Sequence, residues 1–277
     1  MRKLFKTKKR LLGALLLSAA VLLTAAFYNG LTAAEYTLRS EKIDRAVTIV
    51  LLTDLHSGEF GKNQQKLIEK IDAQKPGLVL MSGDIADDIA PDAQLLPLLE
   101  HLSGRYPCYY VTGNHEFWSG RVDAQKALFR RYGITVLAGS CAQVTVNGQT
   151  LSIGGVDDPE SGEAEFSAQL AQAAAAVRPE QYAVLLAHRP ERLDAYAAAG
   201  FDLVLSGHAH GGQWRIPFLL PQGVFAPNQG LFPKHTTGIR EKDGTKLLVS
   251  RGLAQKTTIV PRIFNPPELV VVRLEAS

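Results

Sequence analysis

Short apolar runs recur along this chain of 277 residues, and each run gives way to a polar or glycine-rich segment. Runs in which nearly every residue is apolar are typical of buried parallel strands. Amphipathic segments lie between them. In one, residues 63–74, Leu67, Ile68 and Ile71 fall on one helical face. Strands alternating with helices predict an α/β domain. The expected strands cover residues 46–53, 78–82, 108–112, 182–187 and 202–206, and further helices cover 92–102, 164–177 and 191–199.

Two regions predict hairpins instead of this alternation. Between residues 134 and 156 the pattern changes to short strands around Asn147-Gly148, a strong hairpin signal. We expect this hairpin to extend the first sheet by antiparallel pairing. A second hairpin is expected around Asp243-Gly244, followed by a last strand over residues 268–274.

The chain begins with a basic segment followed by residues 11–27, seventeen positions without a charge. This apolar run is near the lower length limit of a membrane span and longer than most signal-peptide cores. Residues 1–10 hold six Lys or Arg and no acid, so the positive-inside rule places the N terminus in the cytoplasm. We therefore expect residues 1–28 to anchor a single-pass cell-membrane protein whose catalytic domain is extracytoplasmic. A cleaved signal peptide is the competing interpretation.

The remaining residues predict a connector over 29–45 and one domain over 46–277. Without the six N-terminal cations, this part has 24 Lys and Arg against 27 Asp and Glu. A domain with slightly more acidic than basic residues lacks the excess of positive charge that nucleic-acid binders have, so no nucleic-acid partner is expected. Cys108 and Cys141 are the only cysteines, and their spacing does not establish a disulfide.

Polar side chains follow each of five predicted strands. The carboxyl ends of strands in an open α/β sheet form the edge that carries chemistry. Imidazole, carboxylate and amide donors suit divalent metals such as Mn, Fe or Zn, and five of the seven histidines fall in these segments. In the last segment two imidazoles at alternate positions of an extended chain would point the same way. The segments are Asp54-Leu55-His56, Gly83-Asp84, Gly113-Asn114-His115-Glu116, His188 and Gly207-His208-Ala209-His210.

In this order the five segments resemble the motifs of the calcineurin-like metallophosphoesterase superfamily, over residues 46–275. Within it, Asp-Leu-His and His-Ala-His-Gly-Gly-Gln are similar to the membrane-associated bacterial branch. The resemblance implies a four-layer α/β/β/α sandwich of two mixed sheets face to face, with helices outside. It also implies a phosphodiesterase-like enzyme that hydrolyses phosphomono- or diesters by attack of a metal-bridging hydroxide.

The resemblance further implies two divalent ions, Mn, Fe, Zn or a mixture, held by seven side chains. These are Asp54, His56 and His210 for the first ion, Asn114, His188 and His208 for the second, and Asp84 as the bridge. His115 is implied as the catalytic residue, acting as general acid to the leaving oxygen or as electrostatic stabiliser of the phosphate.

Several neighbouring residues are candidates for supporting roles. Glu116 is a candidate to orient a ligand imidazole, and Asp87 and Asp88 form a solvated loop or contact the ligands from outside. Three further basic residues are candidates to steer an anionic substrate: Arg189, Arg251 and His235. For His235, a position in a surface loop is the simpler interpretation.

The segment Trp214–Phe232 is rich in large apolar residues, with neither a helical nor a strand period, and it follows His210 closely. A loop this apolar packs on the core or meets another apolar surface. We expect a membrane-facing or acyl-binding lip beside the metals, with packing under the hairpin as the alternative. The phosphoester substrate would then be a phospholipid or glycolipid. Two other functions stay open, a pyrophosphatase of nucleotide-linked glycolipids and a non-catalytic metal-binding scaffold.

Overall fold

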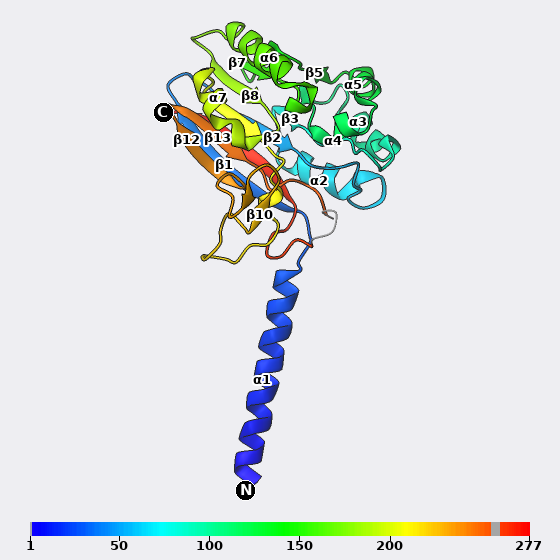
Figure 1. Cartoon of the computed structure of the whole chain (residues 1–277), viewed down its shortest axis with the longest axis vertical. Coiled ribbons are helices and arrows are strands. Elements are labelled where there is room, and N and C mark those ends of the chain that lie inside the picture. Colours follow the sequence, from blue (N-terminus) through cyan, green and yellow to red (C-terminus); the bar gives the residue numbers. More distant parts are fainter. Residues whose placement is uncertain (1, 256–260) are drawn as a thin grey trace.

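Two six-stranded sheets form the centre of the domain in this computed structural model, which describes residues 2–255 and 261–277 (Figure 1). The first sheet has the spatial order β1 (Thr32–Ser40), β14 (Glu268–Ala276), β2 (Val47–Leu52), β3 (Leu78–Ser82), β4 (Cys108–Val111) and β5 (Thr135–Val136). The second has the order β12 (Gly238–Lys242), β13 (Thr245–Val249), β9 (Leu203–Ser206), β8 (Tyr182–Leu186), β7 (Gln149–Gly155) and β6 (Ser140–Val146).

The sheets pack face to face, and helices cover both outer faces. Successive side chains of a strand point to opposite faces. Leu51 accordingly lies in the core between the sheets, whereas its neighbour Leu52 lies in the core under the first helical layer. The four-layer α/β/β/α sandwich predicted from the sequence is confirmed. The first layer has α2 (Gln65–Ala73), α3 (Leu96–Leu102) and α5 (Val122–Arg131), and the second has α6 (Glu163–Ala175) and α7 (Leu193–Ala198).

Shorter helical turns connect these elements. The helix expected over residues 92–102 divides at Pro97, which stands in the first turn of α3, where a missing N–H costs no hydrogen bond. The remaining short elements are α4 (Asn114–Trp118) and the 3-10 turns η1 (Lys62–Gln64), η2 (Asp92–Leu95), η3 (Pro159–Ser161), η4 (Pro190–Arg192) and η5 (His210–Gly212).

The hairpin around Asn147-Gly148 forms, but its predicted place in the first sheet is wrong. Strands β6 and β7 belong to the second sheet, where β7 pairs in parallel with β8. The chain passes from the first sheet to the second within residues 137–139. Leu137 N still donates to Tyr110 O of the first sheet, whereas Gly139 N already donates to Gly155 O of the second. Only the two-residue strand β5 extends the first sheet.

The segment expected to be a connector, residues 29–45, contributes a strand that the sequence analysis did not identify. Strand β1 runs parallel to β14 and forms one edge of the first sheet. Its inward residues Ala34, Tyr36 and Leu38 pack against the core between the sheets. This period of two is present in the sequence, although polar residues between them obscure it.

Helix α1 (Arg2–Ala26) extends away from the domain (Figure 1). Its part Thr7–Ala26 is long and apolar enough to cross a membrane, and a signal sequence near an N terminus would meet the same criteria. The helix ends on the domain. Ala26 is buried, and its carbonyl oxygen accepts a hydrogen bond of 2.7 Å from Phe264 N.

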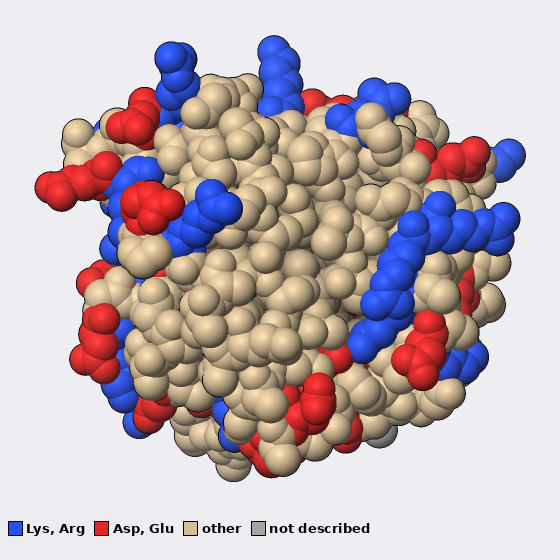
Figure 2. All heavy atoms as spheres, turned by 90° about the horizontal axis from the view of Figure 1, so that it is seen from above, with Lys and Arg blue, Asp and Glu red and all other residues tan. Residues whose placement is uncertain are grey.

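The face of the domain opposite α1 carries charges of both signs around a centre of uncharged residues (Figure 2). Acidic and basic side chains stand side by side along its rim, so this face is not a basic surface of the kind that binds nucleic acid. The two cysteines are unbonded and lie in different sheets, Cys108 in β4 and Cys141 in β6.

Candidate metal centre

The seven predicted metal donors lie together at the carboxyl ends of strands from both sheets. Two acids follow strands of the first sheet, Asp54 after β2 and Asp84 after β3, while Asn114 opens α4 just beyond β4. The second sheet supplies the other side through loops that follow β8 and β9. These loops carry His188, His208 and His210. The site therefore depends on the two sheets packing in one orientation.

Six of the seven form two groups, each with ligand atoms within 4.8 Å of one another: Asp54, His56 and His210 in one, and Asp84, His188 and His208 in the other. Asp84 also groups with His56, so this carboxylate is within reach of both sets. Its Oδ2 lies 3.1 Å from His188 Nε2 and 3.8 Å from His56 Nε2. This central position is the one that the motif resemblance gave to a bridging residue.

The expected extended conformation of residues 208–210 is wrong. His208 and His210 have φ angles of 65° and 45°, and the chain turns into η5. The two imidazoles consequently belong to different donor groups. Asp54, His56 and Asp84 also have positive φ. Strained backbone of this kind persists where the surrounding structure holds it, typically at functional sites.

Three buried donor atoms in the centre make no hydrogen bond of good geometry to another described residue: Asp84 Oδ2, Asn114 Oδ1 and His188 Nε2. Asp84 Oδ2 and His188 Nε2 lie 3.1 Å apart and form an ion pair when the imidazole is protonated. Leaving buried polar atoms unpaired costs about 1–3 kcal/mol each. Divalent cations prefer oxygen and imidazole donors and would satisfy all three atoms, so the residues present fit a metal centre.

Close backbone approach makes two glycines necessary in this cradle. A Cβ added to Gly207 would lie 1.9 Å from Thr53 Oγ1 and 2.4 Å from Asp54 Oδ2. A Cβ added to Gly113 would lie 2.2 Å from Asp84 Oδ1. Both separations are far below van der Waals contact, so any side chain there would displace a donor carboxylate.

The pKa values of three imidazoles in the centre are shifted far from the ordinary value of histidine. Burial lowers the pKa of His188, but the carboxylates of Asp84 and Asp54 outweigh it and raise the pKa to about 10. Burial and the positive charge of His188 hold the pKa of His208 well below its usual range. Burial, with His56 and Arg262 nearby, does the same to His210. Neutral imidazole is the form that binds metal.

His208 has an outer contact that the sequence did not indicate. Asn228 Oδ1 lies 2.7 Å from His208 Nε2, and an Arg189 nitrogen lies 3.3 Å from the same atom. Arg189 in turn donates to both oxygens of Asp158 at 2.6 and 2.8 Å. A hydrogen bond from Nε2–H to Asn228 leaves Nδ1 of a neutral ring unprotonated and able to bind metal.

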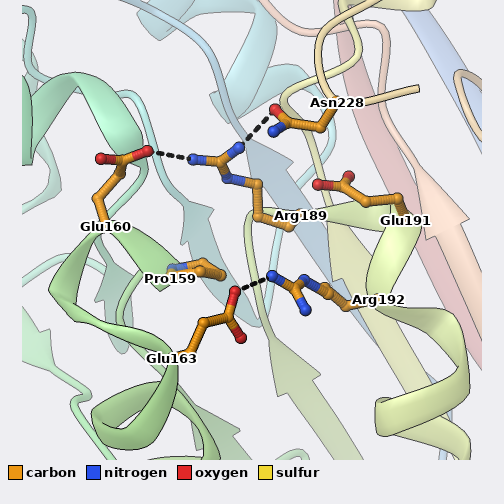
Figure 3. Close-up of a pocket in the computed structure, with 7 residues that line it drawn as sticks. All are labelled: Pro159, Glu160, Glu163, Arg189, Glu191, Arg192 and Asn228. Carbon is orange, nitrogen blue, oxygen red and sulfur yellow. Dashed lines mark hydrogen bonds and ion pairs between the residues drawn. The ribbon is translucent and has the colours of Figure 1, made fainter. Parts of the chain in front are cut away.

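A cavity of about 220 Å³ lies on the far side of this contact (Figure 3). Arg189 and Asn228 form the wall that it shares with the metal centre, and Arg192 pairs with Glu163 across it. Acids offset both guanidinium charges, since Arg189 also contacts Glu160 at 3.2 Å. Steering of an anion by Arg189 therefore finds no support. The lining residues are Pro159, Glu160, Glu163, Arg189, Glu191, Arg192 and Asn228.

His115 lies at the edge of the first donor group. Its ring centroid is 4.3 Å from that of His56, and its Nδ1 lies 2.7 Å from Asp88 Oδ1. Asp87 Oδ1 lies 3.3 Å from His56 Nδ1, so both acids contact site imidazoles from outside. Burial lowers the pKa of His115, but hydrogen bonding to Asp87 and the charges of Asp84 and Asp88 raise it to about 9.

Glu116 has a different role from the expected one. Instead of contacting an imidazole, its carboxylate accepts four backbone N–H groups, from Asp84, Ile85, Ala86 and Gly113, at 2.7–3.0 Å. The side chain is fully buried, and burial together with the charge of Asp84 raises its pKa to about 7. Glu116 thus ties the loop after β3 to the loop after β4.

The remaining candidates for anion binding lie outside the donor groups. Arg251 donates to the buried carboxylate of Glu268 at 2.5 Å, and His235 is in a loop after β11 (Gly230–Leu231), half-buried. Arg262, which the sequence analysis did not single out, is buried with a terminal nitrogen 3.4 Å from His210 Nδ1. An isolated arginine far along the chain gave no pattern from which to infer this contact.

Comparison with known proteins identifies the family of this chain. The family model for calcineurin-like phosphoesterases matches residues 47–212, more than half of the chain. The chain is 31% identical over 251 residues to a metallophosphoesterase of Campylobacter jejuni, covering 85% of this chain and 61% of that protein. It thus spans less than two thirds of that relative's length.

Two proteins of Bacillus subtilis match more completely. The metallophosphoesterase YkuE is 27% identical over 254 residues, covering 88% of this chain and 85% of YkuE. The protein YpbG is 29% identical over 279 residues, covering 97% and 98%. The family match and the clustered donors lead to one conclusion: this chain belongs to the calcineurin-like phosphoesterase family of metal-dependent hydrolases.

Proposed function

We propose that the domain over residues 46–277 is a dinuclear-metal-dependent phosphoesterase, anchored in the membrane by residues 11–27, that hydrolyses phosphomono- or diesters. The observation that supports it best is the central place of Asp84. Its Oδ2 lies 3.1 Å from His188 Nε2 and 3.8 Å from His56 Nε2, so one buried carboxylate adjoins imidazoles of both donor groups. A single carboxylate shared between two donor sets suits a pair of adjacent cations.

In this proposal Asp54, His56 and His210 hold one divalent ion, Asn114, His188 and His208 hold the other, and Asp84 bridges them. When bound, Mn, Fe or Zn ions would neutralise the phosphate and acidify a water molecule. The protein keeps the donors in place from outside. Asn228 fixes the ring of His208, Asp87 contacts His56, and Glu116 holds the backbone of Asp84.

His115 would protonate the leaving alcohol. The Asp88 carboxylate accepts from Nδ1–H at 2.7 Å and so fixes the ring, leaving Nε2 to donate a proton to the leaving oxygen. The backbone N–H of His115 donates to Asp84 Oδ1 at 2.9 Å, which couples the position of the acid to the bridging carboxylate. His115 therefore acts on substrate, and Asp88 is a positioning residue.

Insertion of α1 would place the catalytic domain outside the cytoplasm, because six cations precede the apolar run. An enzyme held at the bilayer meets lipid-linked phosphoesters at high local concentration, which makes phospholipids or glycolipids the leading substrate class. Nucleotide-linked glycolipids of the cytoplasm would be out of reach.

The decisive experiment measures metal content and hydrolysis of bis-p-nitrophenyl phosphate by the full chain in detergent. We expect two ions per chain, and expect Asp84→Asn to lower both occupancy and rate, the rate by at least about 100-fold. Asp72→Asn, remote from the donors, is the matched control and should retain both. Unchanged metal content in Asp84→Asn would contradict the assignment. A metal-loaded wild-type chain that hydrolyses no mono- or diester would indicate a scaffold.

A further inference from the structure

The segment Trp214–Phe232, called here the apolar lip, leaves its largest side chains in solvent. In these nineteen residues Arg215 is the only charged one. Phe218 is 100% exposed and Leu219 77%. The alternative of packing under the hairpin does not hold for these side chains. A contiguous exposed patch of large apolar residues marks an interaction surface. Five other large apolar side chains of the lip are at least 44% exposed: Trp214, Ile216, Phe225, Leu231 and Phe232.

The lip is an ordered part of the fold, with two short turns on a fixed base. In one turn Leu220 N donates to Ile216 O at 2.8 Å. In the other, β10 (Phe225–Ala226) pairs antiparallel with β11, which sets Phe225 opposite Leu231. At the base, Val224 N donates to Gly212 O at 3.0 Å. The family match ends at this same Gly212, two residues before the lip begins.

The base of the lip adjoins the end of α1. Trp214 forms a parallel β-bridge with Ile263, and its indole nitrogen donates to Pro261 O at 2.8 Å. Phe264, which follows Ile263 in the chain, donates its backbone N–H to Ala26 O at 2.7 Å. One strip of chain is thus shared by the lip and the helix end. Figure 1 shows the loops around β10 at the end of the domain from which α1 emerges.

We propose that the apolar lip lies on the lipid surface of the membrane that α1 enters, which rests on the membrane anchoring proposed above. Helix α1 ends at Ala26 and β1 begins at Thr32, so five residues separate the span from the sheet. Fully extended, five residues reach only about 17 Å. The domain must therefore lie against the bilayer, and the apolar residues beside the helix end are the ones that meet it.

This contact also bears on the metal centre. Asn228 lies within the lip and contacts His208, so the segment that meets lipid is the one that positions a metal donor. A lipid-linked ester held at the bilayer surface would reach the centre along the lip without leaving the membrane. The partner is lipid rather than a soluble protein because the lip adjoins a helix of membrane-spanning length.

The test uses the full chain in phosphatidylcholine vesicles, with an environment-sensitive fluorophore on a single cysteine. Cys108→Ala and Cys141→Ser remove the native thiols. Labels are placed at Phe218→Cys and Leu231→Cys, both at exposed sites, and the control is Ile89→Cys, an 86% exposed apolar residue outside the lip. Lipids carrying a nitroxide on the acyl chain should quench both lip labels at least about two-fold and leave the control unchanged.

Equal quenching by aqueous iodide at all three positions, without nitroxide quenching, would overturn the proposal. Lip labels shielded from iodide but not quenched by the nitroxide lipids would overturn it too, because a protein then covers the lip. The same labelled proteins are assayed on bis-p-nitrophenyl phosphate, a soluble substrate. Full hydrolysis without lipid quenching would reject the lip alone, and lipid quenching without hydrolysis would reject the phosphoesterase alone.

Discussion

Asn228 Oδ1 lies 2.7 Å from His208 Nε2, although the two are twenty positions apart along the chain. This contact comes from the apolar lip and, in the proposed function, leaves Nδ1 of His208 as the nitrogen that would bind metal. Partners of this kind typically change metal affinity 10- to 100-fold when they are removed. In the proposed function, a residue outside the recognised motifs therefore positions a donor inside them.

Asn228→Ala should therefore weaken metal binding by about 10-fold or more, as measured by competition with a chelating dye. Asn228→Asp keeps an acceptor at the same position and should restore most of the affinity. Gln229→Ala, next in the chain but hydrogen-bonded to His235 O, serves as the control. If Asn228→Ala binds metal as tightly as the wild type, the proposed positioning role is wrong.

Gly207→Ala should impair both stability and metal binding, because its Cβ would overlap Thr53 Oγ1 and press on Asp54. Overpacking of this kind costs about 1–3 kcal/mol. Gly200→Ala is informative beside it, since Gly200 has φ 76° but nothing within 4 Å of its Cβ. Its backbone strain costs about 1 kcal/mol without touching the donors. Urea unfolding and metal titration of both variants separate the two effects. Equal metal affinity in the two variants would argue against the overlap.

Glu116→Gln should loosen the centre without removing a donor. The carboxylate uses both oxygens for four backbone N–H groups, whereas glutamine offers one oxygen and turns an NH₂ group toward the others. Unpaired buried donors predict a loss of about 3 kcal/mol in unfolding free energy. Glu69→Gln, at an exposed position of α2, should change it by less than about 0.5 kcal/mol. Hydrogen exchange at Ile85 and Ala86 gives an independent measure, and unchanged protection there would count against this role.

Asp72, which lies outside the candidate metal centre, is expected to make a pH-dependent contribution to the stability of the fold. Burial opposes the shift, but hydrogen bonds from His101 and Tyr106 lower the pKa of Asp72 below its ordinary value. A carboxylate with a depressed native pKa stabilises the fold above its unfolded pKa, and the contribution disappears as pH falls through the native value.

Asp72→Asn should thus lower the unfolding free energy at pH 7 by about 0.5 kcal/mol, because the Asp72 side chain is 35% exposed and solvent screens its interactions. The difference should shrink below about pH 4. Urea unfolding curves at a series of pH values test this. Exposed Glu180→Gln should show no comparable effect at either pH. A difference in unfolding free energy that stays constant down to the lowest pH would show that the ionised carboxylate of Asp72 is not responsible.

Most of the strands, and the segments that carry the candidate donors, could be predicted from the sequence because both are local patterns. A short apolar run such as Leu78–Ser82 favours a buried strand, and Asp84, two residues after it, then emerges at that strand's carboxyl end. The apolar composition of Trp214–Phe232 was also a local signal, whereas its exposure came only from the structure. These features follow from residue order and from the geometry of a strand, whatever the remainder of the chain does.

Only the tertiary structure decided which strands pair and which distant side chains meet. The hairpin at Asn147-Gly148 could pair with either sheet, and the crossing at residues 137–139 put it in the second. Likewise Asn228 on His208, and the four amides on Glu116, are contacts between segments whose approach depends on how the two sheets pack. Sequence specifies the conformation of each segment, whereas contacts between segments are set by the burial of shared apolar faces, which no single segment contains.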